Sequence, residues 1–247
     1  MLNLTQKQIL KGFLLKMTIN RKGNIRVKRI LFETENSLPP SFSQSEITKI
    51  FTDMIELQQL YNGAIREISS KLETLDEEFQ ILYSHNPIHH IESRLKAPRS
   101  IIDKLIKRNF PVSIESAMEN ITDIAGIRVI CHYIDDVYTV EKLITEQSDV
   151  TVIKKSDYIE QPKPNGYRSL HIIASVPVYL SKQVRHVPVE IQLRTIAMDF
   201  WASLEHKLRY KSSDEIKDDL QSQLKECAEQ ISLVDSQMQE IHEKIYK

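Results

Sequence analysis

The 247-residue sequence contains few of the features that mark several large classes of protein. Its two cysteines, Cys131 and Cys227, have no CxxC spacing and no cluster of histidines beside them, which argues against a disulfide framework and a zinc site. No stretch approaches the ~20 consecutive apolar residues of a membrane-spanning helix. Only five glycines occur, and the P-loop pattern GxxxxGK(S/T) and the dinucleotide-binding pattern GxGxxG are both missing. We therefore expect any phosphate group to be held by side chains.

The composition is that of a globular protein, but the charge is unevenly placed. Apolar residues make up 41% of the chain, enough for a sizeable core, and the net charge of -1 gives no overall attraction to nucleic acid. The segment Met1–Phe32 nevertheless carries eight Lys and Arg residues and no acidic residue. We interpret residues 1–43 as a basic, loosely ordered N-terminal extension that ends in a turn at Pro39 and Pro40. It lacks the long apolar run of a secretory signal, so we expect a cytoplasmic protein.

Hydrophobic periodicity predicts a chain of helices and strands. Apolar residues recur at steps of three and four from Ser45 to Tyr83, which predicts a long amphipathic helix. A near-heptad spacing from Ile216 to Ile245 predicts a final helix that packs against a partner helix, in this chain or in another subunit. Between them we expect a helix at about 136–146 and strands within 121–133, 150–155, 167–180 and 187–193.

The stretch Val187–Lys211 predicts two consecutive amphipathic elements, a strand and then a helix. Apolar residues alternate with Glu190, Gln192 and Arg194, so we expect a half-buried strand whose polar side chains lie about 7 Å apart on one face. Thr195 is a suitable N-cap for the helix that follows, in which Ile196, Phe200, Leu204 and Leu208 recur every fourth residue. The alternative is a solvent-exposed strand face followed by an ordinary amphipathic helix.

Residues 93–111 form a strongly basic segment. It contains six Lys and Arg residues but only one acidic residue, Asp103. Lys104 and Arg108 lie on the same face of the expected helix, where their charges repel unless an anion lies between them. Ser100 is placed to cap this short helix. The segment is suited to binding phosphate, although a solvated basic helix face has the same pattern.

Four single residues suggest a binding site. Arg128 interrupts an apolar strand, so it must be paired or must face a cleft. Asp123 and Glu190, each at a strand edge, can hold magnesium between them and a triphosphate. Tyr167 follows the Asn165-Gly166 turn and can stack on a base, in which case phenylalanine should serve nearly as well; the alternative is an ordinary strand tyrosine.

Four motifs in order, between about Ser93 and Lys211, carry a resemblance to a known family. They read SRLKAPRSIIDKLIKR, DIAGIRVIC, NGYRSLH and VEIQLRTIAMDFWASLEHK. The chain thus resembles the small alarmone synthetases of the RelA/SpoT family, of the RelP/RelQ type. The resemblance implies an α/β (α+β) fold, with a nucleotidyltransferase-like mixed sheet flanked by helices and long N- and C-terminal helices. We divide the chain accordingly into the extension 1–43, a helical segment 44–92, a synthetase domain 93–212 and an oligomerisation helix 213–247.

The same resemblance implies an activity. Such enzymes transfer pyrophosphate from ATP to the 3′-hydroxyl of GDP or GTP, giving AMP and ppGpp or pppGpp, the alarmones of the bacterial stringent response. Mg2+ is the implied cofactor, and a homotetramer joined through the terminal helices is the implied assembly, with RNA contact through the basic segments as a further expectation. None of the eight histidines is followed by Asp, as the hydrolase motif of longer relatives requires, so we expect a synthetase only. The alternative is a catalytically silent nucleotide- or RNA-binding module with the same fold.

The resemblance also assigns residue roles. Asp123 and Glu190 are the expected catalytic and magnesium-binding carboxylates, with Glu190 able to accept the proton of the attacking hydroxyl. The expected ATP-binding residues are Arg94 and Arg128, on either side of the adenine, and Lys96, Ser100, Lys104 and Arg108 on the phosphates. The expected GDP- or GTP-binding residues are Tyr167 stacked on guanine, Asp199 on the guanine edge, and Arg168, His171, Gln192 and Lys207 on phosphates and ribose.

Overall fold

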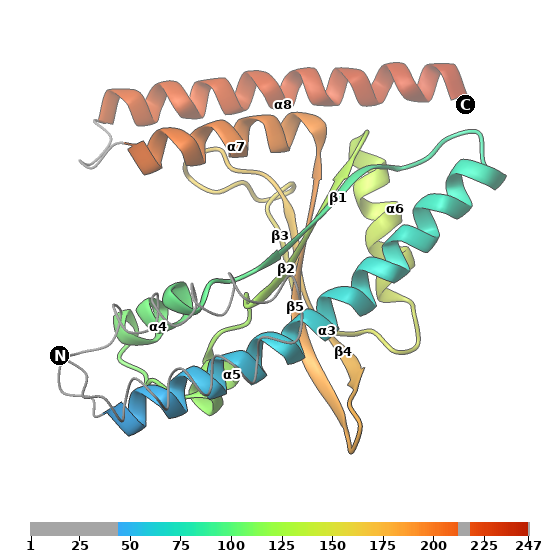
Figure 1. Ribbon diagram of the computed structural model, residues 1–247. Helices are drawn as coiled ribbons and strands as arrows, with labels where there is room; N and C mark the ends of the chain where they lie inside the picture. The colour runs from blue at the N-terminus through green and yellow to red at the C-terminus, as the bar shows by residue number, and fades with distance from the viewer. Residues whose placement is uncertain (1–43, 212–217, 247) are drawn as a thin grey trace, which may run out of the picture. The chain divides into compact units, whose positions relative to one another are not determined.

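The computed structural model describes residues 44–211 and 218–246, so the expectations for the basic extension 1–43 fall outside the described residues. The elements, shown in Figure 1, are α3 (Gln44–Leu82), β1 (Ile88–Leu95), α4 (Pro98–Lys107), α5 (Ile114–Asn120), β2 (Ala125–Cys131), α6 (Ile134–Thr145), β3 (Thr151–Asp157), β4 (Leu170–Tyr179), β5 (Val184–Thr195), α7 (Ile196–Lys211) and α8 (Asp218–Tyr246). The predicted α/β (α+β) class is confirmed. Residue contacts divide the chain into two units, 1–57 with 96–121, and 58–95 with 122–247.

The first unit is built around α4 and α5. On α4, Ile101, Ile102 and Leu105 are fully buried, which leaves the basic residues on its other faces. The prediction that Ser100 caps this helix is wrong. The helix begins two residues earlier, at Pro98 after the N-cap Ala97, because proline needs no backbone N–H bond in the first turn.

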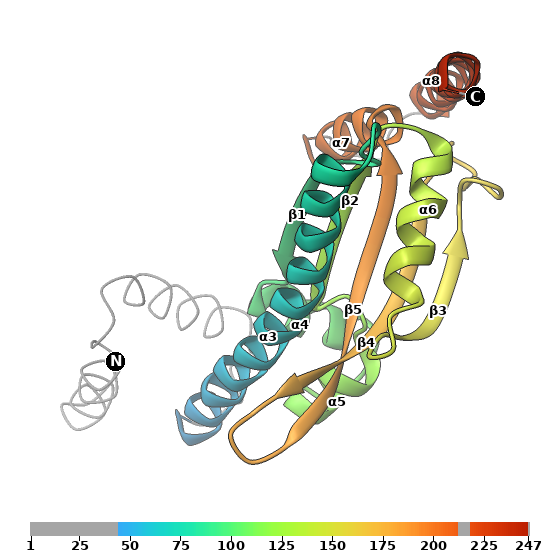
Figure 2. The same ribbon diagram turned by 90° about the vertical axis from the view of Figure 1, so that its right-hand side faces the viewer.

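The second unit contains a five-stranded sheet in the order β1-β2-β5-β4-β3. Only β2 and β5 are parallel, so the sheet is mixed, as expected. Figure 2 shows α6 and the α3 residues of this unit along one face of the sheet. The apolar side of β5 is buried, and Gly63 lets α3 approach β4 closely, since a Cβ atom there would lie 2.7 Å from Val178 Cγ1.

The last two helices pack beside each other at the end of β5 (Figure 1). The predicted N-cap is confirmed, because Thr195 Oγ1 accepts a hydrogen bond from Met198 N at 3.1 Å. The same hydroxyl donates to the buried Asp235 of α8 at 2.6 Å, and the Trp201 indole N–H donates to Leu224 O at 3.0 Å. Among the described helices, none is both long enough and apolar enough to cross a membrane.

Candidate active site

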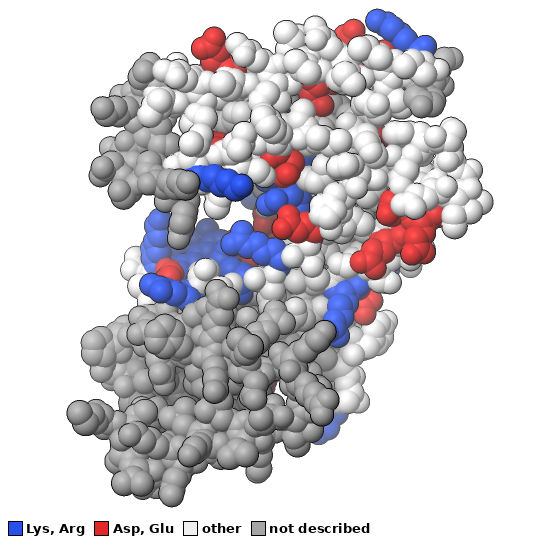
Figure 3. All heavy atoms as spheres, turned by 45° about the horizontal axis from the view of Figure 1, so that its top comes forward, with Lys and Arg blue, Asp and Glu red and all other residues white. Residues whose placement is uncertain are grey.

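One face of the sheet carries a continuous row of polar side chains. Glu92 of β1 lies opposite Arg128 of β2, which lies opposite Gln192 of β5. Gln192 in turn lies opposite His171 of β4. Glu190 lies two residues before Gln192, on the same face, as the alternating sequence predicted. Four strands therefore bring charged and polar groups to one surface, and Figure 3 shows basic and acidic side chains next to one another on the molecule.

Arg128 is paired, which explains how a charge is tolerated in this strand. Its Nη1 lies 3.1 Å from Glu92 Oε2 and 3.6 Å from Asp199 Oδ1 on α7. Its Nε is buried and has no hydrogen-bond acceptor among the described residues. The guanidinium thus has one buried N–H group that the described residues leave without an acceptor.

Glu190 is a partly buried carboxylate in a hydrogen-bonded setting. His171 Nδ1 lies 3.3 Å from its Oε1, and the Gln192 amide donates to its Oε2 at 3.1 Å. Burial acts to raise the pKa of Glu190, but the hydrogen bond and charge of His171, together with the Gln192 amide, outweigh it and lower that pKa. Glu190 is therefore ionised and able to accept a proton near neutral pH.

A second carboxylate lies within electrostatic reach of the first. Asp123 precedes β2, and its charge acts to raise the pKa of Glu190. Two such carboxylates fit a cation held jointly by protein and phosphate oxygens, the arrangement that Mg2+ favours. Residues 44–211 and 218–246 contain no group of three or more His, Cys, Asp or Glu placed as a self-sufficient metal site.

A glycine leaves the polar face open beside Glu190. In the register, Gly126 lies between Arg94 of β1 and Glu190 of β5. A Cβ atom at Gly126 would come no closer than 3.6 Å to Arg94 O, an ordinary contact, so packing does not require glycine there. The missing side chain leaves space between an exposed arginine and the two carboxylates.

Tyr167 stands at the end of a loop that is held against α8. Gly166 has φ of 86°, and a Cβ atom there would lie 2.5 Å from Ala228 Cβ, so both the turn and the close approach require glycine. The Tyr167 backbone N–H donates to Asn165 Oδ1 at 3.3 Å, and its hydroxyl lies 2.8 Å from His171 Nε2. These contacts connect the aromatic ring to the polar row.

Arg194 forms hydrogen bonds to several of these groups, although the sequence alone assigned it no role. Its position on the polar face of β5 was expected from the alternation. Its burial was not expected, and only 5% of the residue is exposed. Its guanidinium donates to the Tyr167 hydroxyl, Gln192 Oε1 at 3.1 Å, Asp199 Oδ1 at 3.0 Å and Ser169 Oγ at 3.4 Å.

The remaining expected site residues lie on other elements, and each is described by itself. Arg168 faces α8, where its Nη1 donates to Ala228 O at 3.5 Å and its charge acts on Asp235. Lys207 is exposed on α7, about two turns beyond Asp199. The expected phosphate-binding residues of the first unit are half-buried or exposed on and around α4: Lys96, Ser100, Lys104 and Arg108.

Comparison with known proteins identifies the relatives of this chain. Residues 93–215 match the family described as the region found in RelA / SpoT proteins. The chain is 42% identical over 186 residues to the GTP pyrophosphokinase YwaC of Bacillus subtilis, a match that covers 75% of this chain and 89% of that protein.

Solved structures of small alarmone synthetase 1 from Bacillus subtilis share the fold. The one bound to its product pppGpp has a TM-score of 0.70 and 34% identity, and covers 76% of this chain and 95% of that chain. The one bound to AMPCPP has a TM-score of 0.67 and 30% identity, with coverages of 78% and 98%.

The environment of Glu190 predicts how its titration depends on His171. In His171→Ala we expect the pKa of Glu190 to rise, because burial then acts without its main opposing hydrogen bond and charge. His171→Asn is the matched control, since its amide keeps an N–H donor near the position of Nδ1. Carbon-13 NMR titration of the glutamate carboxyl groups measures both variants. An unchanged Glu190 pKa in His171→Ala would contradict the assigned cause.

Proposed function

The chain belongs to the RelA/SpoT family, and on that basis we propose that it is a (p)ppGpp synthetase, a GTP pyrophosphokinase of the small alarmone synthetase type. It transfers the pyrophosphate group of ATP to the 3′-hydroxyl of GDP or GTP. The single observation that carries the proposal is the polar face of the sheet, where an ionised Glu190 shares one hydrogen-bonded network with Tyr167. A proton acceptor thus lies beside an aromatic ring on which a base can stack.

The acceptor nucleotide binds at the network around Tyr167. Its guanine stacks on the Tyr167 ring, and the Asp199 carboxylate accepts hydrogen bonds from guanine N1 and N2. His171, Gln192 and Lys207 serve the ribose and phosphates. Arg168 completes this proposed set, for which its Nη1 would turn away from Ala228 O, to which it donates at 3.5 Å.

For ATP we propose two groups of residues, each described by itself: the arginines of β1 and β2 for the adenine, and the basic residues on and around α4 for the phosphates. Arg94 lies opposite Gly126, two residues before Arg128, so the two arginines are diagonal neighbours about 7–8 Å apart, with room for a flat ring between their side chains. Ser100, Lys104 and Arg108 follow i, i+4 spacing along α4, which gives the phosphates one row of donors. Lys96 adds a further cation.

The reaction is an in-line displacement at the β-phosphorus of ATP. The acceptor 3′-oxygen forms a bond to this phosphorus as its proton passes to Glu190, and the bond to the α,β-bridging oxygen breaks, releasing AMP. The protein contributes position and charge, since arginines and lysines offset the charge on the transferred group. Asp123 and Glu190 would hold Mg2+, which when bound neutralises phosphate charge.

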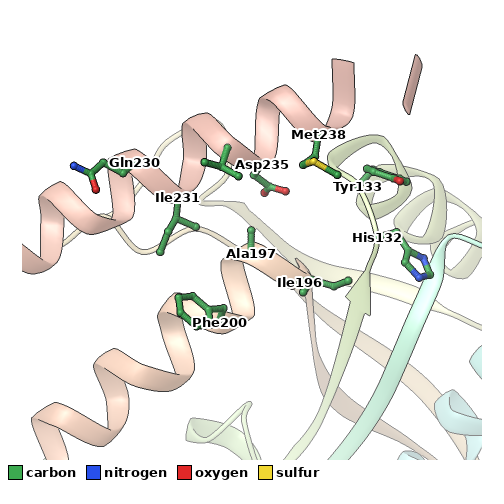
Figure 4. A pocket seen from close by; sticks show the side chains of 10 residues that line it. His132, Tyr133, Ile196, Ala197, Phe200, Gln230, Ile231, Asp235 and Met238 are labelled. Carbon is green, nitrogen blue, oxygen red and sulfur yellow. The ribbon is translucent and has the colours of Figure 1, made fainter. Parts of the chain in front are cut away.

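We further propose that the chain forms a homotetramer through its terminal helices. The α7 row of Ile196, Phe200, Leu204 and Leu208 is 45–58% exposed in the single chain. Residues of α7 and α8, with His132 and Tyr133, line an apolar groove of about 700 Å³ (Figure 4). Exposed apolar surface of this kind marks an interaction site, and the near-heptad α8 supplies a matching helix.

Replacing one carboxylate separates catalysis from binding. In Glu190→Gln we expect turnover to fall about 10²–10⁴-fold, the usual contribution of a general base, while both nucleotides still bind within a few-fold. Liquid chromatography should show AMP and the 3′-pyrophosphorylated nucleotide forming in equal amounts from the unchanged protein. Glu141→Gln on α6, whose carboxylate pairs with Lys155, is the matched control. No product from the unchanged protein with either GDP or GTP would overturn the proposed function.

Charges placed in the groove should dissociate the assembly. For the double variant Phe200→Asp and Met238→Asp we expect a lower mass by light scattering, because two carboxylates cannot be buried unpaired in an apolar interface. Gln237→Glu adds a charge to an exposed residue of the same helix and serves as the control. A monomeric unchanged protein at micromolar concentration would contradict the assembly.

A further inference from the structure

Arg194 is buried at the centre of the acceptor site, yet no step above uses it. It lies between the buried Leu193 and Thr195 at the end of β5. Of the four groups that accept its hydrogen bonds, Tyr167, Gln192 and Asp199 belong to the proposed acceptor site. A buried guanidinium must have its N–H groups paired, so it fixes the positions of its partners as firmly as they fix its own.

A series of hydrogen-bonded side chains starts at Arg194. A guanidinium can only donate, so the Tyr167 hydroxyl accepts a hydrogen bond from Arg194, and its oxygen lies 2.8 Å from His171 Nε2. On the other side of the imidazole, His171 Nδ1 lies 3.3 Å from Glu190 Oε1. An ordered chain therefore runs from Arg194 through Tyr167 and His171 to Glu190.

We propose that Arg194 is a positioning residue that couples acceptor binding to the orientation of the general base. It holds the stacking ring, the guanine-facing carboxylate and the Gln192 amide as one unit. Through the Tyr167 hydroxyl and His171, it also directs the Glu190 carboxylate toward the acceptor 3′-hydroxyl. This inference rests on the proposed function and extends it.

The hydrogen bonds from Arg194 to Glu190 change the expected effect of removing the Tyr167 hydroxyl. If Tyr167 only stacked on guanine, Tyr167→Phe would behave almost like the unchanged protein. In the structure, losing the hydroxyl leaves an Arg194 N–H without its acceptor and removes the hydrogen-bond partner of His171 Nε2. Stacking survives this change, but the orientation of His171 and Glu190 does not.

The test compares Tyr167→Phe with Tyr158→Phe in the full-length protein. Tyr158 packs edge-on against both the Tyr167 and His171 rings, at 6.2 and 5.3 Å between centroids, and makes a matched control for the loss of a hydroxyl. In Tyr167→Phe we expect kcat to fall about tenfold, the size of one hydrogen bond, with the KM for GDP within about twofold. Tyr158→Phe should leave kcat unchanged.

A second pair of variants separates positioning from stacking. Tyr167→Ala removes the ring and should raise the KM for GDP roughly 5- to 150-fold, the range of base stacking on an aromatic side chain, with the KM for ATP nearly unchanged. Arg194→Lys should raise the KM for GDP and lower kcat together, because an ammonium cannot reproduce the planar fork. Thermal melting checks that each variant is folded.

The outcomes distinguish this inference from the proposed function. If the unchanged protein is active and Tyr167→Phe matches it in kcat, Arg194 serves stability alone and the inference is wrong. If the unchanged protein makes no product, the proposed function itself fails. A kcat loss in Tyr167→Phe with an unchanged KM for GDP supports the coupling.

Discussion

The active site depends on the need to pair a guanidinium buried in a sheet. Arg194 has 5% of its surface exposed, and leaving such a charge unpaired would cost several kcal/mol. The chain meets this need with a tyrosine, an amide, a carboxylate and a serine drawn from a loop, β5 and α7. The groups proposed to bind the acceptor are therefore held in place before any nucleotide arrives, which lowers the entropy cost of binding and reaction.

Strand register within the second unit sets the relative positions of Glu190 and of the strand residues proposed to bind the nucleotides. The parallel pairing of β2 and β5 sets Gly126 opposite Glu190 and Arg128 opposite Gln192. A shift of one residue would turn the polar row of β5 into the apolar core. Because α3 and α6 cover the apolar face, burial of that face fixes the register and thereby the catalytic geometry.

The period-two and helical patterns predicted most of the second unit correctly. The alternation in Val187–Leu193 gave the polar face of β5, and Thr195 was recognised as a cap before α7. Strand β1 and helix α5 were missed, because β1 is an edge strand with mostly exposed residues and no clean alternation, and α5 has only seven residues. Short and exposed elements carry too weak a periodic signal.

The sequence predicted which types of residue lie near the site, but not where each side chain points. Arg194 and Arg168 are both cations near the expected site, yet one turns inward to Tyr167 and the other turns to α8. That choice depends on Gly166 and Ala228, 62 residues apart in the sequence, whose contact brings the loop against the helix. The exposed row on α7 likewise has the spacing of a core face, and nothing in its sequence distinguishes burial within one chain from burial between chains.

In the proposed complex, the acceptor 3′-hydroxyl meets Glu190 while the guanine of the same nucleotide lies on Tyr167. A crystal structure of the protein with GDP and the unreactive ATP analogue AMPCPP measures this directly. We predict a distance of about 2.6–3.2 Å between the 3′-oxygen and a Glu190 carboxylate oxygen, with the guanine stacked on the Tyr167 ring. A guanine bound away from Tyr167, or a 3′-oxygen more than about 5 Å from Glu190 with both nucleotides in place, would contradict it.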